Sequence, residues 1–265
     1  MKILALADLH ADFWDEDGRD PLFGLEDEIA DLSALILAGD ITNKPKKRWT
    51  PALRRLGTLI DPGRIHVIPG NHDFYQFRID GEDRLAGFAS AAGVNYANCT
   101  SIVLEDVRFL CATLWTDFTL PPGRIANESF IPSRMNDFRL IRVAGDGYRR
   151  IRPGDVVSRH LAQKTWLTQE LSRPFDGRTV VVTHHAPHPD ALVPAPGNDL
   201  NLAAAYASDL TEMIETHAPD TWLFGHTHDA AELTVGQTTL RNISLGYPFQ
   251  VPDPQTRIRA LIQTF

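Results

Sequence analysis

Five short apolar segments of this 265-residue chain each end in a cluster of polar residues that can bind metal ions. This pattern constrains the fold more than any other feature. Residues 2–7 lead into Asp8-Leu9-His10, and residues 34–38 lead into Gly39-Asp40. The other three clusters are Gly70-Asn71-His72-Asp73, Thr183-His184-His185 and Gly225-His226-Thr227-His228. Short apolar runs rich in β-branched residues predict buried strands, and helix-like segments lie between several of them, so the chain is predicted to be α/β.

The later half of the chain alternates short strand-like runs with tight turns such as Val235-Gly236-Gln237. A purely parallel sheet would not need such turns, so the pattern favours two sheets with helices outside. The predicted strands are 2–7, 34–38, 65–68, 101–104, 108–114, 179–183, 221–224, 231–235, 238–243 and 258–263. The predicted helices are 25–31, 51–60, 82–92, 158–171 and 202–217. We expect one domain over residues 1–265, with a cap-like insertion around residues 115–157.

Each polar cluster alone has an ordinary explanation, because Gly, Asn and Asp are common in turns and a single His at a strand end is usually structural. Five such clusters in succession are harder to assign to turns. In an open α/β sheet, ligands bind at the carboxyl edge of the strands. Extended backbone would also project Asp8 and His10 from one face. The sequence therefore predicts one shared site at this edge.

The residue types in these clusters fit a metal centre. Imidazole, carboxylate and amide oxygen suit Mn, Fe or Zn, and the absence of thiolates argues against a structural zinc site. The clusters hold too many ligands for one metal ion and enough for two. Two metal ions that share a carboxylate suit in-line displacement at phosphorus.

The five motifs, in their order along the chain, resemble those of the calcineurin-like metallophosphoesterase superfamily. They are DLH (8–10), GD (39–40), GNHD (70–73), THH (183–185) and GHTH (225–228). The resemblance implies a four-layer αββα sandwich of two mixed β-sheets flanked by helices. It also implies a dinuclear-metal-dependent phosphoesterase in which a hydroxide that bridges the metals attacks phosphorus.

The resemblance assigns a role to each motif position. Asp8, His10 and His228 would hold one metal ion, Asn71, His184 and His226 would hold the other, and Asp40 would bridge them. His72 would assist the leaving group, and Asp73 would orient His72. The motif favours His184 over His185 as the ligand. The expected cofactors are two divalent metal ions, with Mn first and Fe or Zn as alternatives.

The predicted insertion contains a locally basic segment in an otherwise acidic chain. Residues 124–152 contain seven arginines and three acids, although the net charge of the whole chain is −8. We expect a lid over the site in which Arg134 or Asn136 contacts phosphate and Trp115 or Phe138 packs on an organic group. The alternative is a packed cap with solvated arginines. His188 could also reach the substrate, although a surface position is favoured for it.

Several function classes remain open within this chemistry. We expect a small phosphodiester or phosphomonoester as substrate, without a preference between them. A nuclease of the same fold is the first alternative, but the net charge of −8 and the lack of a dedicated nucleic-acid module argue against it. A hydrolase of a lipid-linked pyrophosphate would need an apolar docking surface. A non-catalytic interaction scaffold fits the complete ligand set poorly.

The chain is expected to act in the cytoplasm without a membrane partner. No segment approaches the roughly 20 apolar residues of a membrane helix, and Asp8 interrupts the apolar start of the sequence. Cys99 and Cys111 are expected to be free thiols. The sequence gives no prediction of the oligomeric state.

Overall fold

Two mixed sheets pack face to face in the computed structural model, which describes residues 1–193 and 202–265. The first sheet has the order β13-β1-β2-β3-β4, in which β1 to β4 are parallel and β13 is antiparallel to β1. Its strands are β1 (Lys2–Leu6), β2 (Ala34–Ala38), β3 (Ile65–Ile68), β4 (Asn95–Tyr96) and β13 (Ile262–Thr264).

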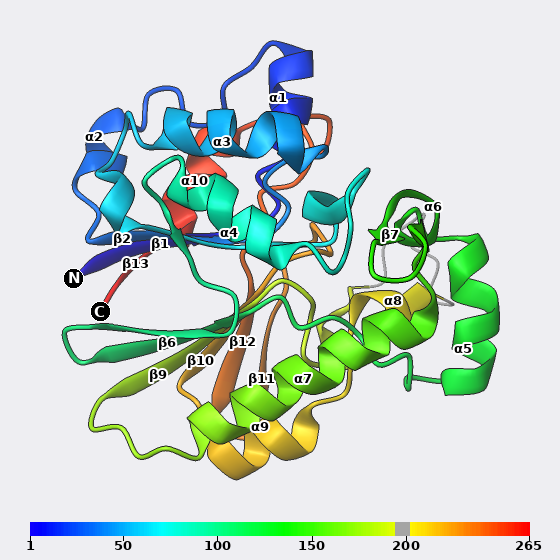
Figure 1. Ribbon diagram of the computed structural model, residues 1–265. Helices are drawn as coiled ribbons and strands as arrows, with labels where there is room; N and C mark the ends of the chain where they lie inside the picture. The colour runs from blue at the N-terminus through cyan, green and yellow to red at the C-terminus, as the bar shows by residue number, and fades with distance from the viewer. Residues whose placement is uncertain (194–201) are drawn as a thin grey trace.

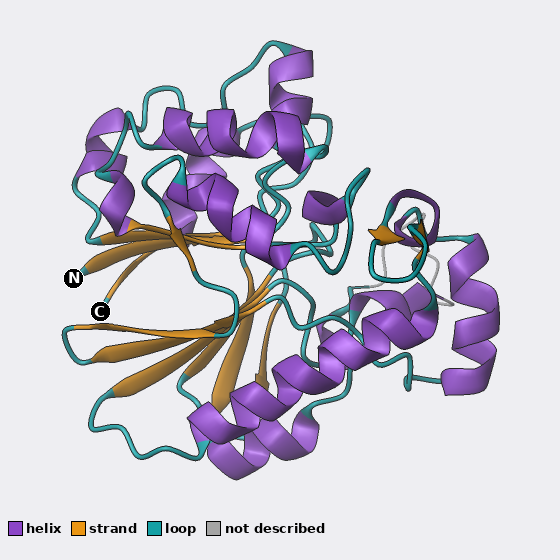
Figure 2. Cartoon of the chain, in the orientation of Figure 1, coloured by secondary structure: helices purple, strands orange, loops and turns teal. Residues whose placement is uncertain are grey.

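The second sheet has the order β11-β12-β10-β9-β6-β5, with four parallel strands inside and an antiparallel strand at each edge. Its strands are β5 (Thr100–Leu104), β6 (Val107–Ala112), β9 (Arg178–Thr183), β10 (Thr221–Phe224), β11 (Glu232–Val235) and β12 (Thr238–Asn242). Helices cover the outer face of both sheets, which gives the four layers visible in Figure 2. The predicted fold class is therefore confirmed.

The helices on the first sheet are α1 (Ala11–Asp17), α2 (Glu26–Ala30), α3 (Pro45–Leu56), α4 (Glu82–Ser90) and α10 (Pro254–Leu261), as Figure 1 shows. The helices α7 (Pro153–Leu171) and α9 (Thr211–His217) cover the second sheet. The short helix α8 spans Ala203–Tyr206. Single 3₁₀ turns lie at Pro62–Arg64, His72–Phe74, Ile131–Ser133 and Pro189–Ala191.

The central strands are buried on both faces, which explains their uninterrupted apolar sequences. Every residue of β2 is buried, and so are Val180, Val181 and Val182 in β9. None of the described helices is long and apolar enough to cross a membrane.

Four predicted elements differ substantially from the structure. The helix expected at 51–60 is α3, which starts at Pro45 and ends at Leu56, so Pro51 lies inside it. Residues 258–263 were expected as a strand, but most of them belong to α10. Asp253 accepts a hydrogen bond from the Thr256 N–H and Pro254 occupies the first turn, so this helix starts with a standard cap. The helix expected at 202–217 is divided into α8 and α9. The helix expected to start at Ser158 starts at Pro153, and α1 was not predicted.

The segment between β6 and α7 lies beside one end of the sandwich (Figure 1). It contains α5 (Arg124–Phe130), α6 (Asp137–Leu140) and a two-stranded pair of β7 (Arg142–Val143) and β8 (Arg149–Arg150). Residues 153–157, which were expected in the insertion, instead form the start of α7.

Two valines of the second sheet offer a matched test of this core. Val181 in β9 is fully buried, whereas Val103 in β5 is 54% exposed. We expect Val181→Ala to lower the free energy of unfolding by about 2 kcal/mol, because it removes buried methyl groups and leaves a cavity. Val103→Ala should change it by less than about 0.5 kcal/mol. Urea unfolding measures both values, and equal losses would contradict this placement of the core.

Candidate metal centre

All five polar clusters meet where the two sheets approach each other. The parallel arrangement places the ends of β1, β2 and β3 on one edge, and it does the same for β9 and β10. Main-chain hydrogen bonds then join the two sheets at this edge. The Ala7 N–H donates to the Ile243 carbonyl at 3.0 Å, and the Leu245 N–H donates to the Ala7 carbonyl at 2.8 Å.

Two motif glycines permit this close approach. A Cβ atom at Gly70 would lie 2.2 Å from Asp40 Oδ1 and 2.6 Å from His184 Cε1. A Cβ atom at Gly225 would lie 2.4 Å from the Ala7 Cβ and 2.7 Å from Asp8 Oδ2. Any larger residue at either position would therefore push ligand side chains apart.

The backbone of five predicted ligands is left-handed rather than extended. The φ angles are 56° at Asp8, 43° at His10, 57° at Asp40, 71° at His226 and 59° at His228. The expectation that extended backbone pairs Asp8 with His10 is therefore wrong, since β1 ends at Leu6 and the chain turns immediately. Such conformations are unfavourable outside glycine and cluster at functional sites.

The structure brings together the three side chains predicted for the first metal ion. Asp8 Oδ1 lies 3.1 Å from His228 Nε2, and His228 Nε2 lies 3.2 Å from His10 Nε2. Metal-ligating atoms of all three residues lie within 4.8 Å of one another.

The side chains predicted for the second metal ion lie beside this group. His184 Nε2 is 3.0 Å from Asn71 Oδ1 and 3.5 Å from Asp40 Oδ1. Asp40, His184 and His226 also have ligand atoms within 4.8 Å of one another. The other carboxylate oxygen of Asp40, Oδ2, is 3.8 Å from His10 Nε2, so Asp40 lies between the two groups.

The hydrogen bonds around these residues fit metal ligation. His184 Nδ1 donates to the Ala38 carbonyl at 3.0 Å, and His228 Nδ1 donates to Gln250 Oε1 at 2.8 Å. In both rings the second nitrogen, Nε2, therefore faces the site, as in metal-binding histidines. The Nε2 atom of His226 is buried and has no hydrogen-bond partner among the described residues.

The charges of the site also fit divalent cations. Asp8 and Asp40 are buried, and neither forms an ion pair with an arginine or lysine of the described residues. Burial, together with the neighbouring Asp8 and Asp73 carboxylates, raises the pKa of Asp40 well above its usual value. Burial lowers the pKa of His10 and His226, which keeps these rings neutral and able to bind metal.

The structure separates the roles of the two adjacent histidines. His184 points its Nε2 atom at Asn71 and Asp40, whereas His185 Nδ1 donates to the Thr113 carbonyl at 3.3 Å. The His185 ring packs against His226, with ring centres 4.4 Å apart. This geometry supports the choice of His184 as the ligand.

Asp73 does not orient His72, so that prediction is wrong. Its carboxylate accepts hydrogen bonds from four groups that hold the loop together: the N–H groups of Ile41, Thr42 and Gly70 and the indole of Trp49. Burial raises the pKa of Asp73 to about 7, and these donors act against that rise. The side chain that hydrogen-bonds to the His72 ring is Asn43, whose Oδ1 lies 3.2 Å from His72 Nδ1. Its place three residues after Asp40 was the one sequence signal for this role.

A cavity of about 310 Å³ opens over the predicted ligands. His72 lies in its wall, with Nε2 3.9 Å from Asp40 Oδ2, and Arg134 and Asn136 reach it from the insertion. Three tyrosines that were not predicted also line it: Tyr75, Tyr206 and Tyr247.

Two expectations about the cavity find no support in the structure. Trp115 and Phe138 are buried and pack against Phe74 and Phe118 respectively, so neither side chain lines the cavity. His188 is not among the lining residues either, and its Nδ1 accepts a hydrogen bond from the Asp190 N–H.

The insertion contributes a buried carboxylate that the sequence did not reveal. Asp137 Oδ1 accepts hydrogen bonds from Asn71 Nδ2 at 2.9 Å and from the Tyr75 hydroxyl at 2.6 Å. An ionised carboxylate accepts hydrogen bonds but cannot donate them, so Asp137 binds the NH₂ group of Asn71. The amide oxygen of Asn71, Oδ1, is therefore directed toward His184.

The sequence of the chain matches a class of phosphoric ester hydrolases. The calcineurin-like phosphoesterase family model matches residues 1–230, and the chain belongs to that family. A relative from Acanthamoeba polyphaga mimivirus, described as uncharacterized protein L509, is 25% identical over 267 residues that cover 93% of this chain and 92% of the relative.

Solved structures show the same fold at low sequence identity. Phosphopantetheinyl hydrolase (PptH) from Mycobacterium tuberculosis superposes with a TM-score of 0.70 at 17% identity, covering 95% of this chain and 91% of that one. Purple acid phosphatase PPD1 from yellow lupin (Lupinus luteus) seeds gives a TM-score of 0.52 at 11% identity, covering 92% of this chain and 43% of that one.

The close approach at Gly70 can be tested without an activity assay. We expect Gly70→Ala to weaken Mn²⁺ binding at least about tenfold, because the new methyl group displaces Asp40. Gly87→Ala is the matched control, since Gly87 lies in α4 and a Cβ atom there meets nothing within 4 Å. Calorimetric titration measures both affinities. Equal affinities for the two variants would show that Gly70 is not needed for the centre.

Proposed function

We propose that the protein is a dinuclear-metal-dependent phosphoesterase that hydrolyses a small phosphodiester or phosphomonoester. One observation carries the proposal. Two groups of ligand atoms, Asp8/His10/His228 and Asp40/His184/His226, lie side by side under a single cavity, with Asp40 within 4 Å of His10 and of His184. Asn71 completes the second group.

Two divalent ions held there would act as Lewis acids on the phosphoryl group and would supply an activated water as nucleophile. Manganese is the first candidate for both ions, and Fe or Zn also suit histidine and carboxylate ligands. The imidazoles of His10, His184, His226 and His228 and the two buried carboxylates of the centre would hold them.

His72 is the proposed proton donor to the leaving oxygen, because it lines the cavity and its Nε2 atom faces Asp40. Burial lowers the pKa of His72 to about 3 in the free protein. An anionic phosphate ester beside the ring would oppose this effect and favour the protonated form. His72 would then take up a proton at Nε2 and pass it to the leaving group.

Arg134 and Asn136 are proposed to bind phosphate oxygens at the mouth of the cavity. The guanidinium of Arg134 lies over the Phe130 ring, 5.2 Å from its centre, which fixes it at the edge of the insertion. The three cavity tyrosines would provide surface for the organic part of a small ester.

A substrate panel with added metals tests the function. It should contain p-nitrophenyl phosphate, bis(p-nitrophenyl) phosphate, cyclic nucleotides, single-stranded DNA and a phosphopantetheinyl ester, each with Mn, Zn, Ni and Mg. The proposal expects hydrolysis of small esters with at least one metal. Cleavage of DNA alone would favour a nuclease, and no turnover under any condition would contradict the enzyme assignment.

Replacing His72 and Asp40 should separate proton donation from metal binding. We expect His72→Ala to keep its metal and to lose about 100-fold or more in kcat on esters with poor leaving groups, because these need a proton donor. Asp40→Ala should lose metal, because the shared ligand is gone. Elemental analysis and kinetics on paired substrates measure the two effects. Full activity of His72→Ala on an alkyl ester would show that His72 is not the proton donor.

Arg134→Ala should raise KM about tenfold or more while kcat changes little, because the arginine binds ground state and transition state alike. Arg124→Ala is the control within the same insertion, since Arg124 pairs with Glu128 on α5 and does not line the cavity. An unchanged KM for Arg134→Ala on every accepted substrate would exclude the phosphate contact.

A further inference from the structure

A series of hydrogen bonds connects His72 to Asp12 and Arg48, which line a second cavity. His72 Nδ1 lies 3.2 Å from Asn43 Oδ1, and Asn43 Nδ2 donates to Asp12 Oδ2 at 3.0 Å. The Asn43 backbone N–H also donates to this oxygen, at 3.2 Å. Arg48 Nη1 completes the chain with a 2.7 Å hydrogen bond to the same atom.

The carboxylate of Asp12 determines which atoms donate and which accept in these hydrogen bonds. An ionised carboxylate only accepts hydrogen bonds, so the Asn43 amide must present its NH₂ group to Asp12 and its oxygen to His72. An amide oxygen also only accepts, so His72 must carry its hydrogen on Nδ1. The lone pair of neutral His72 then lies on Nε2, the nitrogen that faces the cavity.

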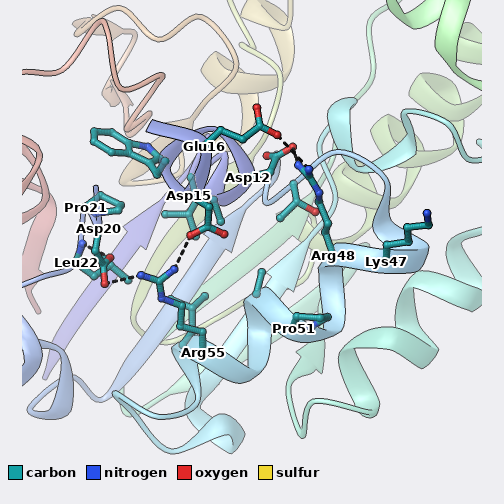
Figure 3. A pocket seen from close by; sticks show the side chains of 16 residues that line it. Asp12, Asp15, Glu16, Asp20, Pro21, Leu22, Lys47, Arg48, Pro51 and Arg55 are labelled. Atoms are coloured by element: carbon teal, nitrogen blue, oxygen red, sulfur yellow. Dashed lines mark hydrogen bonds and ion pairs between the residues drawn. The ribbon is translucent and has the colours of Figure 1, made fainter. Parts of the chain in front are cut away.

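The second cavity shows how Asp12 is held. It has a volume of about 420 Å³ and lies between α1 and α3. Figure 3 shows Arg48 reaching Asp12 and Glu16, while Arg55, two turns further along α3, reaches Asp15 and Asp20. Asp12 is only 4% exposed, so Arg48 supplies the charge that opposes its burial.

We propose that Asp12, held by Arg48, fixes the Asn43 amide and thereby the tautomer and orientation of the His72 imidazole. Asp12, Asn43 and Arg48 are positioning residues that act through His72. The arrangement directs the Nε2 lone pair of the neutral ring toward Asp40. With the amide reversed, the neutral ring would instead carry its hydrogen on Nε2. The kinetic part of this inference rests on the proposed function, but the tautomer does not.

Long-range ¹H–¹⁵N spectra of the metal-free protein labelled at histidine test the tautomer directly. The missing signal in His72→Gln assigns His72. We expect the Nδ1–H tautomer in the unmodified protein. Asn43→Leu removes the acceptor, and Asp12→Asn permits the reversed amide, so both should raise the Nε2–H fraction. Asn43→Asp keeps an acceptor and should retain Nδ1–H.

The two arginines of the second cavity provide a matched control. Arg48→Met should raise the Nε2–H fraction of His72, whereas Arg55→Met removes two ion pairs from the same cavity and should leave the tautomer unchanged. An Nε2–H tautomer in the unmodified protein would overturn the proposal. So would an unchanged tautomer in both Asn43→Leu and Asp12→Asn.

Kinetics separate positioning from general stability. Asn43→Leu should lower kcat about tenfold or more on alkyl esters, with a smaller loss on p-nitrophenyl esters and little change in KM. Asn43→Asp should recover most of the loss. A uniform loss on all esters would show a merely structural role. An inactive unmodified protein would contradict the proposed function, and the spectra would still decide whether Asp12 fixes His72.

Discussion

The close approach of the two sheets at Ala7 and Leu245 is the constraint on which the rest of the centre depends. It forces the ends of five strands into one small volume, where carboxylates and imidazoles face one another at 3 to 4 Å. The backbone is left-handed at Asp8, Asp40 and His226, so the chain turns sharply where each strand ends. These turns allow the two sheets to approach each other. None of these features stabilises the protein by itself, because crowded acceptors and unfavourable φ angles both cost free energy. Cations bound among these ligands would relieve the crowding.

The sequence predicted the parts of the fold that depend on local apolar pattern. The strands Ala34–Ala38, Ile65–Ile68 and Thr221–Phe224 have the predicted bounds, because each is a short, mostly apolar run that a polar or glycine-containing segment follows. The prediction of a strand at 258–263 was wrong, because the apolar residues of this segment fit one face of a helix equally well. The cap at Asp253 was the better signal.

The polar clusters predicted which side chains meet, but not which hydrogen bonds they make. Asp73 follows His72 directly, yet its side chain turns toward Trp49 and the backbone of Ile41 and Thr42. Asn43 reaches His72 from the segment after Asp40, and Asp12 contacts Asn43 from α1, so the order of residues around His72 did not reveal either contact. The cavity tyrosines come from the end of the 3₁₀ turn His72–Phe74, from α8 and from the segment after β12, and they show no common motif.

The hydrogen bond between Asn71 and Asp137 has a thermodynamic consequence for the insertion. Asp137 belongs to α6 of the insertion, whereas Asn71 belongs to the proposed second metal site. If a cation binds more tightly when Asp137 orients Asn71, the docked insertion must become more stable by the same free energy when the cation binds. Metal loading and docking of residues 113–152 are then two linked equilibria. Amide hydrogens of α6 would exchange more slowly in the metal-loaded protein, although they lie outside the centre itself.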